Sequence, residues 1–208
     1  MLLLYSILAG LLIGRVVGGG FGALSDLELR WWWVALGGLV FQLVLFSAPV
    51  AERVGAAGPI LYVGSSVAVF GALLRNLRLT GFPLIALGAG LNLVAIVANG
   101  GYMPSSPDAW LTLNGVAALP SAEYTNSSLI GPSTLLPFLG DIFVLPRPLP
   151  LANVFSIGDV LVGVGAAWCL IGTMTARAGT RAGGSGSKGA TSDEADRTRS
   201  APAPVRAR

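Results

Sequence analysis

Residues 59–98 read PILYVGSSVAVFGALLRNLRLTGFPLIALGAGLNLVAIVA, two apolar stretches separated by one short basic turn. A helix needs about 20 mostly apolar residues to cross a bilayer core of about 30 Å. The two stretches, 59–74 and 82–98, approach that length, and Arg75-Asn76-Leu77-Arg78 interrupts the hydrophobic run between them. This pattern predicts two membrane helices joined by a tight turn at one membrane surface.

Three further apolar stretches lie outside this pair, at residues 2–18, 26–48 and 157–176. Of the 208 residues, 53% are hydrophobic and only 11% are charged, and the mean hydropathy is +0.73. A soluble domain has about 25% charged residues, so this composition argues against a soluble enzyme. We therefore expect an all-α membrane protein with five transmembrane helices, whose first partner is the lipid bilayer.

The basic residues predict how these helices are oriented. Lys and Arg next to membrane segments stay on the cytoplasmic side. In chain order, the gaps between the apolar stretches contain or border Arg15 and Arg30, then Arg53 alone, then Arg75 and Arg78, then Arg147 alone, and last the tail. Because the basic residues concentrate in alternate gaps, we expect a multi-pass protein of the inner cell membrane with its N-terminus outside and its C-terminus in the cytoplasm.

Residues 177–208 differ in composition from residues 1–176. They hold seven Lys or Arg and three acidic residues among Ala, Gly, Ser, Thr and Pro. A segment this poor in large apolar residues cannot bury enough surface to offset the entropy lost on ordering. We expect a disordered basic cytoplasmic tail after a membrane domain of residues 1–176, and no nucleic-acid partner, because the positive charge belongs to this tail.

Small and polar residues recur on particular helix faces. Gly10, Gly14 and Gly18 form a double GxxxG pattern, which permits close helix packing within the fold or self-association of two copies. Gln42 lies in the middle of the second apolar stretch and should face the bundle, since a buried amide needs a partner. The fourth stretch carries an inward stripe of Gly88, Asn92, Ala95 and Asn99.

Two stretches match a capping box, in which a Ser and an acidic residue three positions later exchange hydrogen bonds at a helix start. Ser25 and Glu28 predict the start of the second helix, and Ser156 and Asp159 predict the start of the fifth. The three residues Asn99-Gly100-Gly101 are typical of a helix C-cap followed by a glycine turn.

The gap at residues 100–155 is far longer than an ordinary connection of up to about 12–15 residues. It is rich in aromatic residues and Leu, which argues against disorder, so we expect a structured extracytoplasmic loop. Within it, residues 135–145 form an apolar stretch too short to span the membrane and interrupted by Pro137 and Gly140. We interpret this stretch as a re-entrant or interfacial segment packed on the bundle.

A polar pocket could form where this loop meets the helix ends. The candidate lining residues are Asn92, Asn99, Glu123, Asn126, Asp141 and Asp159. Paired carboxylates could perform acid–base chemistry or bind a hard cation, while the alternative is that these residues only cap helices and turns. The chain has no His and one Cys, Cys169, which excludes His-based catalysis and an intrachain disulfide. We predict no cofactor and no metal site.

Four short stretches resemble a family of bacterial integral membrane proteins of unknown function. They are ANGGYMP at 98–104, Glu123-Tyr124 with Asn126, LGDI at 139–142, and NVFSIGD at 153–159. The resemblance covers about residues 1–176 and implies the same order of helices and loop. It implies no activity, and the Gly-, Ala- and Arg-rich composition suggests a high-GC bacterial source.

Two functional hypotheses follow. The first is an accessory or non-catalytic membrane protein that acts through its loop and helix faces, favoured by the lack of a recognised catalytic motif. The second is a small membrane-embedded enzyme or transporter with a polar pocket on its outer face, favoured by Asn92, Asn99, Asp141 and Asp159.

Overall fold

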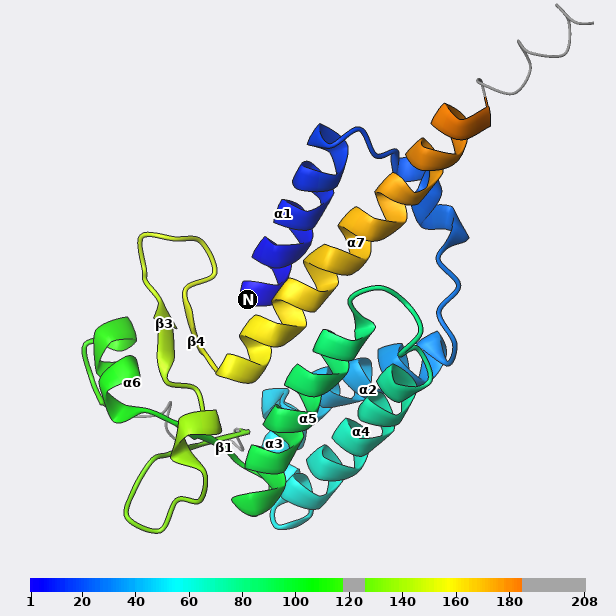
Figure 1. The fold of residues 1–208 in the computed structure, drawn as a ribbon. Coiled ribbons are helices and arrows are strands. Elements are labelled where there is room, and N and C mark those ends of the chain that lie inside the picture. The colour runs from blue at the N-terminus through cyan, green and yellow to red at the C-terminus, as the bar shows by residue number, and fades with distance from the viewer. Residues whose placement is uncertain (118–125, 185–208) are drawn as a thin grey trace, which may run out of the picture.

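The computed structural model describes residues 1–117 and 126–184 of the chain, which are mostly helical (Figure 1). The helices of these residues are α1 (Leu2–Val16), η1 (Phe21–Asp26), α2 (Trp32–Leu45), α3 (Ala48–Val54), α4 (Ala57–Leu74), α5 (Phe82–Ala98), α6 (Pro107–Asn114), η2 (Pro137–Leu139) and α7 (Ile157–Gly184). The strands are β1 (Met103–Ser105), β2 (Ser127–Leu129), β3 (Phe143–Leu145) and β4 (Asn153–Phe155).

Two helices of the described residues are long and apolar enough to cross a membrane, namely α4 and the Ile157–Ala176 part of α7. A third span exists if α2 and α3, which meet at a bend of 81°, count as one broken crossing. The apolar helices α1 and α5 are shorter. Length and composition therefore support two or three of the five predicted crossings.

Helix α7 lies between α1 and α5, and small residues bring all three backbones close together (Figure 1). Gly10 of α1 faces the backbone of Ala167, and Gly14 contacts Met174. On the other side, Gly88 of α5 is so close to the carbonyl oxygen of Gly158 that a Cβ atom would overlap it. Gly10 and Gly14 thus serve packing within the chain, whereas the prediction is wrong for Gly18, which lies after the end of α1 in a left-handed conformation with open space around it. Self-association through these glycines stays a prediction.

Helices α2 and α4 pack against each other, and α4 also packs against α5 of the first three helices. The Gln42 Nε2 atom of α2 donates to Ser65 Oγ at 3.1 Å and Ser66 Oγ at 3.2 Å, which confirms that this amide faces the bundle. The outward faces of the same helices expose large apolar side chains, including Leu36 and Leu43 of α2. Such continuous apolar surface is unusual for a water-soluble monomer.

The segments that carry Arg15, Arg30, Arg75 and Arg78 gather at one end of the bundle, named the basic end below. The buried Asn76 side chain accepts from the Arg30 backbone N–H at 2.8 Å and donates to the Arg30 carbonyl oxygen at 2.7 Å. The Gly20 N–H donates to the Met174 carbonyl oxygen at 3.1 Å. The Arg75 guanidinium lies over the Trp31 ring at 5.3 Å.

The capping box predicted at Ser25 and Glu28 is wrong. Ser25 Oγ instead donates to the Gly22 carbonyl oxygen within η1, and α2 begins only at Trp32, after Trp31 in a left-handed conformation with φ of 58°. The physical reason is tertiary: the hydrogen bond that Asn76 accepts from the Arg30 N–H and the one that it donates to the Arg30 carbonyl oxygen fix the backbone there and so set where the helix starts.

Two other helix boundaries differ from prediction. The predicted second helix, 26–48, ends at Leu45, and a further short helix, α3, occupies residues expected to form a loop. Helix α7 continues past Ala176 to Gly184, into the segment predicted to be disordered. The Ala and Arg residues of this stretch favour a helix, while its three glycines oppose one. Residues 185–208 lie outside the described residues.

The segment between α5 and α7 contains strands, which the prediction of an all-α fold did not include. Strands β1 and β2 pair in parallel, and β3 and β4 pair antiparallel. Prolines and glycines prevent a continuous helix here, so short strand pairs satisfy backbone groups instead. The apolar stretch 135–145 folds as η2 followed by β3, and η2 contacts α5.

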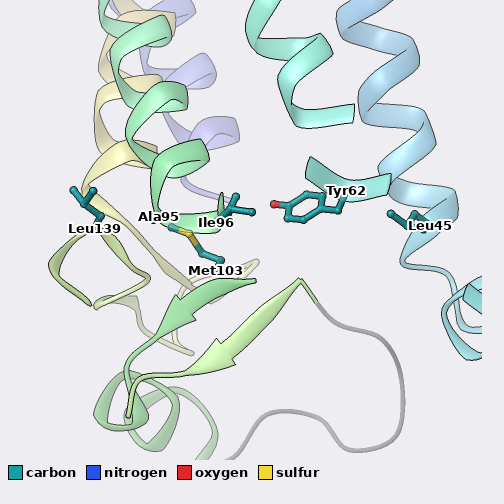
Figure 2. Close-up of a cluster of buried hydrophobic side chains, with 6 residues drawn as sticks. All are labelled: Leu45, Tyr62, Ala95, Ile96, Met103 and Leu139. Carbon is teal, nitrogen blue, oxygen red and sulfur yellow. The ribbon is translucent and has the colours of Figure 1, made fainter. Parts of the chain in front are cut away.

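A buried cluster attaches this segment to the helices (Figure 2). Tyr62 extends from α4 toward Ile96 of α5, and Met103 of β1 and Leu139 of η2 pack beside them. Phe46 contacts the Tyr62 ring edge-on, with ring centroids 5.1 Å apart. The segment is therefore held against the bundle end opposite the basic end, where α5 ends and α7 begins.

Candidate functional site

A cavity of about 490 Å³ lies where the segment between α5 and α7 meets helices α4, α5 and α7. It is called the polar cavity below. Four of the six predicted pocket residues line it: Asn92, Asn126, Asp141 and Asp159. They come from α5, the start of β2, the turn before β3 and the first turn of α7, so the fold brings together side chains that are far apart in the sequence.

The helix start of α7 forms one wall of the cavity. Ser156 and Asp159 exchange hydrogen bonds as a capping box, with both bonds at 3.0 Å, which confirms the prediction for this pair. Asn92 joins the box from α5: its Nδ2 donates to Asp159 Oδ1 at 2.9 Å, and its Oδ1 accepts from Ser156 Oγ at 2.8 Å. Both carboxylate oxygens of Asp159 therefore already accept a hydrogen bond.

Gly158 makes this arrangement possible. A Cβ atom at Gly158 would overlap the Asn92 side chain and the Gly88 carbonyl oxygen. Only glycine lets the amide of Asn92 approach the first turn of α7 so closely. The stretch FSIGD thus combines a helix cap with a close approach of two helices.

Asp141 has a different environment. Its backbone is held by hydrogen bonds with the Pro104 carbonyl oxygen at 2.7 Å and the Ser106 N–H at 3.0 Å. Its carboxyl group has a side-chain donor in Ser105 Oγ, at 3.4 Å. Burial away from water, together with the negative charge of Asp159, raises the pKa of Asp141 from its usual 3.8 to about 7, and the Ser105 hydroxyl opposes this shift.

Backbone packing fixes the position of Asp141. Gly140 lies against the Pro104 carbonyl oxygen, where a Cβ atom would overlap it. Ser105, which is fully buried, forms an isolated bridge with Asp141. The bridge to β1 thus holds Asp141 at the cavity wall.

The cavity residues that were not predicted from the sequence include Tyr62 and Trp110. Asn126 Nδ2 donates to the Tyr62 hydroxyl oxygen at 3.5 Å. Trp110 Nε1 is buried and has no hydrogen-bond partner among the described residues. An aromatic residue inside an apolar helix or an amphipathic loop helix gives no sequence signal of its own, so only the fold could identify this pair.

The structure does not place the other two predicted residues in the cavity lining. Asn99 is the C-cap of α5, which confirms the cap prediction; its amide donates to the Leu135 carbonyl oxygen and accepts from the Leu135 N–H, at 2.8 and 2.9 Å. It anchors the stretch 135–145 to the helix. Glu123 lies outside the described residues.

The described part of the chain contains no group of three or more His, Cys, Asp or Glu side chains arranged to hold a metal ion. The chemical resources of the cavity are two carboxyl groups, several amides and hydroxyls, and aromatic rings. Such a set can recognise a small polar molecule by hydrogen bonds and charge.

Comparison with known proteins gives a family match and no activity. Residues 26–171 match the model of a family of unknown function (DUF5317), a region that begins after α1 and is shorter than the 1–176 expected. No curated protein and no solved structure shows detectable similarity.

Proposed function

The chain belongs to this family of unknown function, and from the geometry of its polar cavity we propose that it is a multi-pass membrane protein that binds a small polar molecule. The observation that carries the proposal is the convergence of Asn92, Asn126, Asp141 and Asp159 on one cavity. A cavity of about 490 Å³ lies within the range of about 300–1,000 Å³ typical of small-molecule sites.

The proposed topology has five crossings, with the N-terminus and the polar cavity outside and the basic end in the cytoplasm. The gathering of Arg30, Arg75 and Arg78 at one end supports it, since basic residues stay on the cytoplasmic side. Helix α1 has 15 residues and α5 has 17. At 1.5 Å per residue they measure about 22 and 26 Å, so flanking residues would complete each crossing.

Binding without catalysis fits the lining better than acid–base chemistry. A pair of catalytic carboxyl groups needs both members available to the substrate. Asp159 instead uses its two oxygens for Asn92 and the Ser156 N–H. We therefore propose that the chain is an accessory protein that acts by binding a ligand and does not catalyse a reaction.

The test is to fill the cavity. Val162 of α7 lines it, whereas Val164 on the same helix is 52% exposed and faces away. Purified wild-type protein should gain thermal stability from a low-molecular-weight cell extract, because a ligand that binds the native state stabilises it. Val162→Phe should lose this gain while Val164→Phe keeps it. Equal stabilisation of both variants would contradict a role for the cavity.

A further inference from the structure

The charges around the polar cavity are unbalanced. Its two lining carboxyl groups are Asp141 and Asp159, and no Lys or Arg side chain of the described residues lines it. The backbone amino group of Met1 lies at the cavity wall and lowers the pKa of Asp141. Its effect on that pKa is smaller than the effects of burial, Asp159 and Ser105. Two carboxyl groups therefore face a single amino group in this cavity.

Aromatic rings add a second feature. Tyr62, Trp110 and Phe155 all line the cavity, from α4, α6 and β4. The faces of such rings attract ammonium groups, most strongly where water is excluded. The cavity therefore offers two kinds of group that stabilise a positive charge.

We infer that the polar cavity binds a small organic cation, a protonated amine that also carries an oxygen acceptor. This inference rests on the proposed function and specifies its ligand. The ammonium group pairs with Asp141, whose carboxyl group has, among the described residues, only the Ser105 hydroxyl as a side-chain donor, at 3.4 Å. The oxygen of the ligand accepts from Trp110 Nε1, a buried donor without a partner among the described residues.

Other ligand classes fit the lining less well. An anion would face both carboxyl groups at once, and the repulsion between like charges costs free energy at groups that are partly buried. A neutral polyol would satisfy Trp110 but would leave the repulsion between Asp141 and Asp159 in place. A cation relieves that repulsion and favours loss of the Asp141 proton.

The pH dependence follows from this linkage. With a pKa of about 7, about a tenth of Asp141 is ionised at pH 6 and about nine tenths at pH 8. The groups that face it are Asp159, Tyr62 and the amino group of Met1. A cation that requires the Asp141 carboxylate should therefore bind about tenfold more tightly at pH 8 than at pH 6.

The experiment is calorimetric titration of the full chain in a neutral detergent with ethanolamine, which stays protonated at both pH values. The uncharged analogue 1,2-ethanediol is the control probe. We expect ethanolamine to bind about tenfold more tightly at pH 8 than at pH 6, and ethanediol not to bind. Absence of ethanolamine binding, equal affinity at both pH values, or equal binding of ethanediol would overturn the inference.

Variants locate the binding. Asp141→Asn should abolish ethanolamine binding, whereas Asp108→Asn, at an exposed position on α6, should leave it unchanged. Trp110→Phe keeps an aromatic ring, removes the N–H donor and should weaken binding several-fold. If Asp141→Asn does not fold, the pH dependence of ethanolamine binding to the wild type and the affinity of Trp110→Phe test the inference instead. Unchanged affinity in Trp110→Phe would contradict the contact assigned between the ligand oxygen and Trp110.

The same ammonium chemistry occurs in free amines and in lipid headgroups, and a second arm separates these sources. The chain is placed in nanodiscs of phosphatidylglycerol, with or without phosphatidylethanolamine, and titrated with ethanolamine. Competition by phosphatidylethanolamine indicates a headgroup ligand, and equal binding in both lipids indicates a free amine.

If the cell extract stabilises the wild type but not Val162→Phe while ethanolamine fails to bind, the ligand class is wrong and the proposed function stands.

Discussion

The two ends of the helix bundle differ in the sign and the exposure of their charged side chains. At the basic end, Arg30, Arg75 and Arg78 are exposed, and the tryptophans at 31–33 are exposed beside them. At the cavity end, Asp141 and Asp159 are partly buried under the folded segment between α5 and α7. One end exposes its basic side chains, and the other holds two carboxyl groups partly away from water.

This difference suggests separate tasks for the two ends. Exposed Arg and Trp side chains are typical of groups that position a protein at a membrane surface. Burying a carboxyl group costs stability unless a partner compensates for it, and natural proteins keep such costly groups mainly where function needs them. The following predictions test this division, from the largest expected effect to the smallest.

The largest effect is expected at the junction of α5 and α7. Gly88→Ala would place a Cβ atom against the Gly158 carbonyl oxygen and the Val162 N–H, so the helices must separate. We expect a loss of about 3 kcal/mol or more, at the upper end of overpacking costs, measured as a lower thermal midpoint and reduced accumulation. Gly64→Ala on α4, which has open space around it, should be neutral or slightly stabilising. Equal stability of the two variants would show that the close approach is not needed.

At the basic end, Asn76→Ala should cost about 2 kcal/mol, since each lost hydrogen bond contributes about 0.5–1.5 kcal/mol. The buried Asn76 amide bonds both backbone groups of Arg30 and the Ala72 carbonyl oxygen. Thermal unfolding measures the loss, and ethanolamine binding at the cavity end should stay intact. Loss of that binding in a folded variant would mean that the two ends are coupled.

At the cavity end, Asp141→Asn should stabilise the ligand-free protein at pH 8. The pKa of Asp141 is higher in the folded state than its ordinary value, so its ionisation removes stability as the pH rises from about 4 to about 7. Asn carries no charge and avoids this loss. We expect a gain of about 1–2 kcal/mol at pH 8, or several degrees in the thermal midpoint, and no gain at pH 4.5. A variant less stable than the wild type at pH 8 would assign Asp141 a structural role.

The smallest effect is expected for Arg75→Gln. The guanidinium lies over the exposed Trp31 ring, a contact worth about 0.5–1 kcal/mol. Thermal unfolding should show at most a slight loss. A change as large as that of Asn76→Ala would mean that Arg75 has a further role at the basic end.

Local sequence signals predicted the parts of the fold that depend on local contacts. The cap at Ser156 and Asp159, the C-cap at Asn99 and the inward Gln42 were all found from spacing and polarity. The same kind of signal failed at Ser25, because Asn76, far along the chain, holds the backbone at Arg30 and decides where α2 begins.

The candidate site was predictable only in part for the same reason. Polar residues such as Asn92, Asp141 and Asp159 stand out in an apolar sequence and were found. Tyr62 and Trp110 do not stand out, because an aromatic residue is common in apolar helices, and their place in the cavity depends on the strand pairing of the segment between α5 and α7. That pairing joins residues without a regular sequence period.

The most direct test of the account is the side of the membrane that each end faces. In a Cys169→Ser background, Asp108→Cys on α6 and Arg78→Cys at the basic end provide single exposed thiols. A membrane-impermeant maleimide should label position 108 in intact cells and position 78 only after permeabilisation. Labelling of position 78 but not position 108 in intact cells would contradict the account.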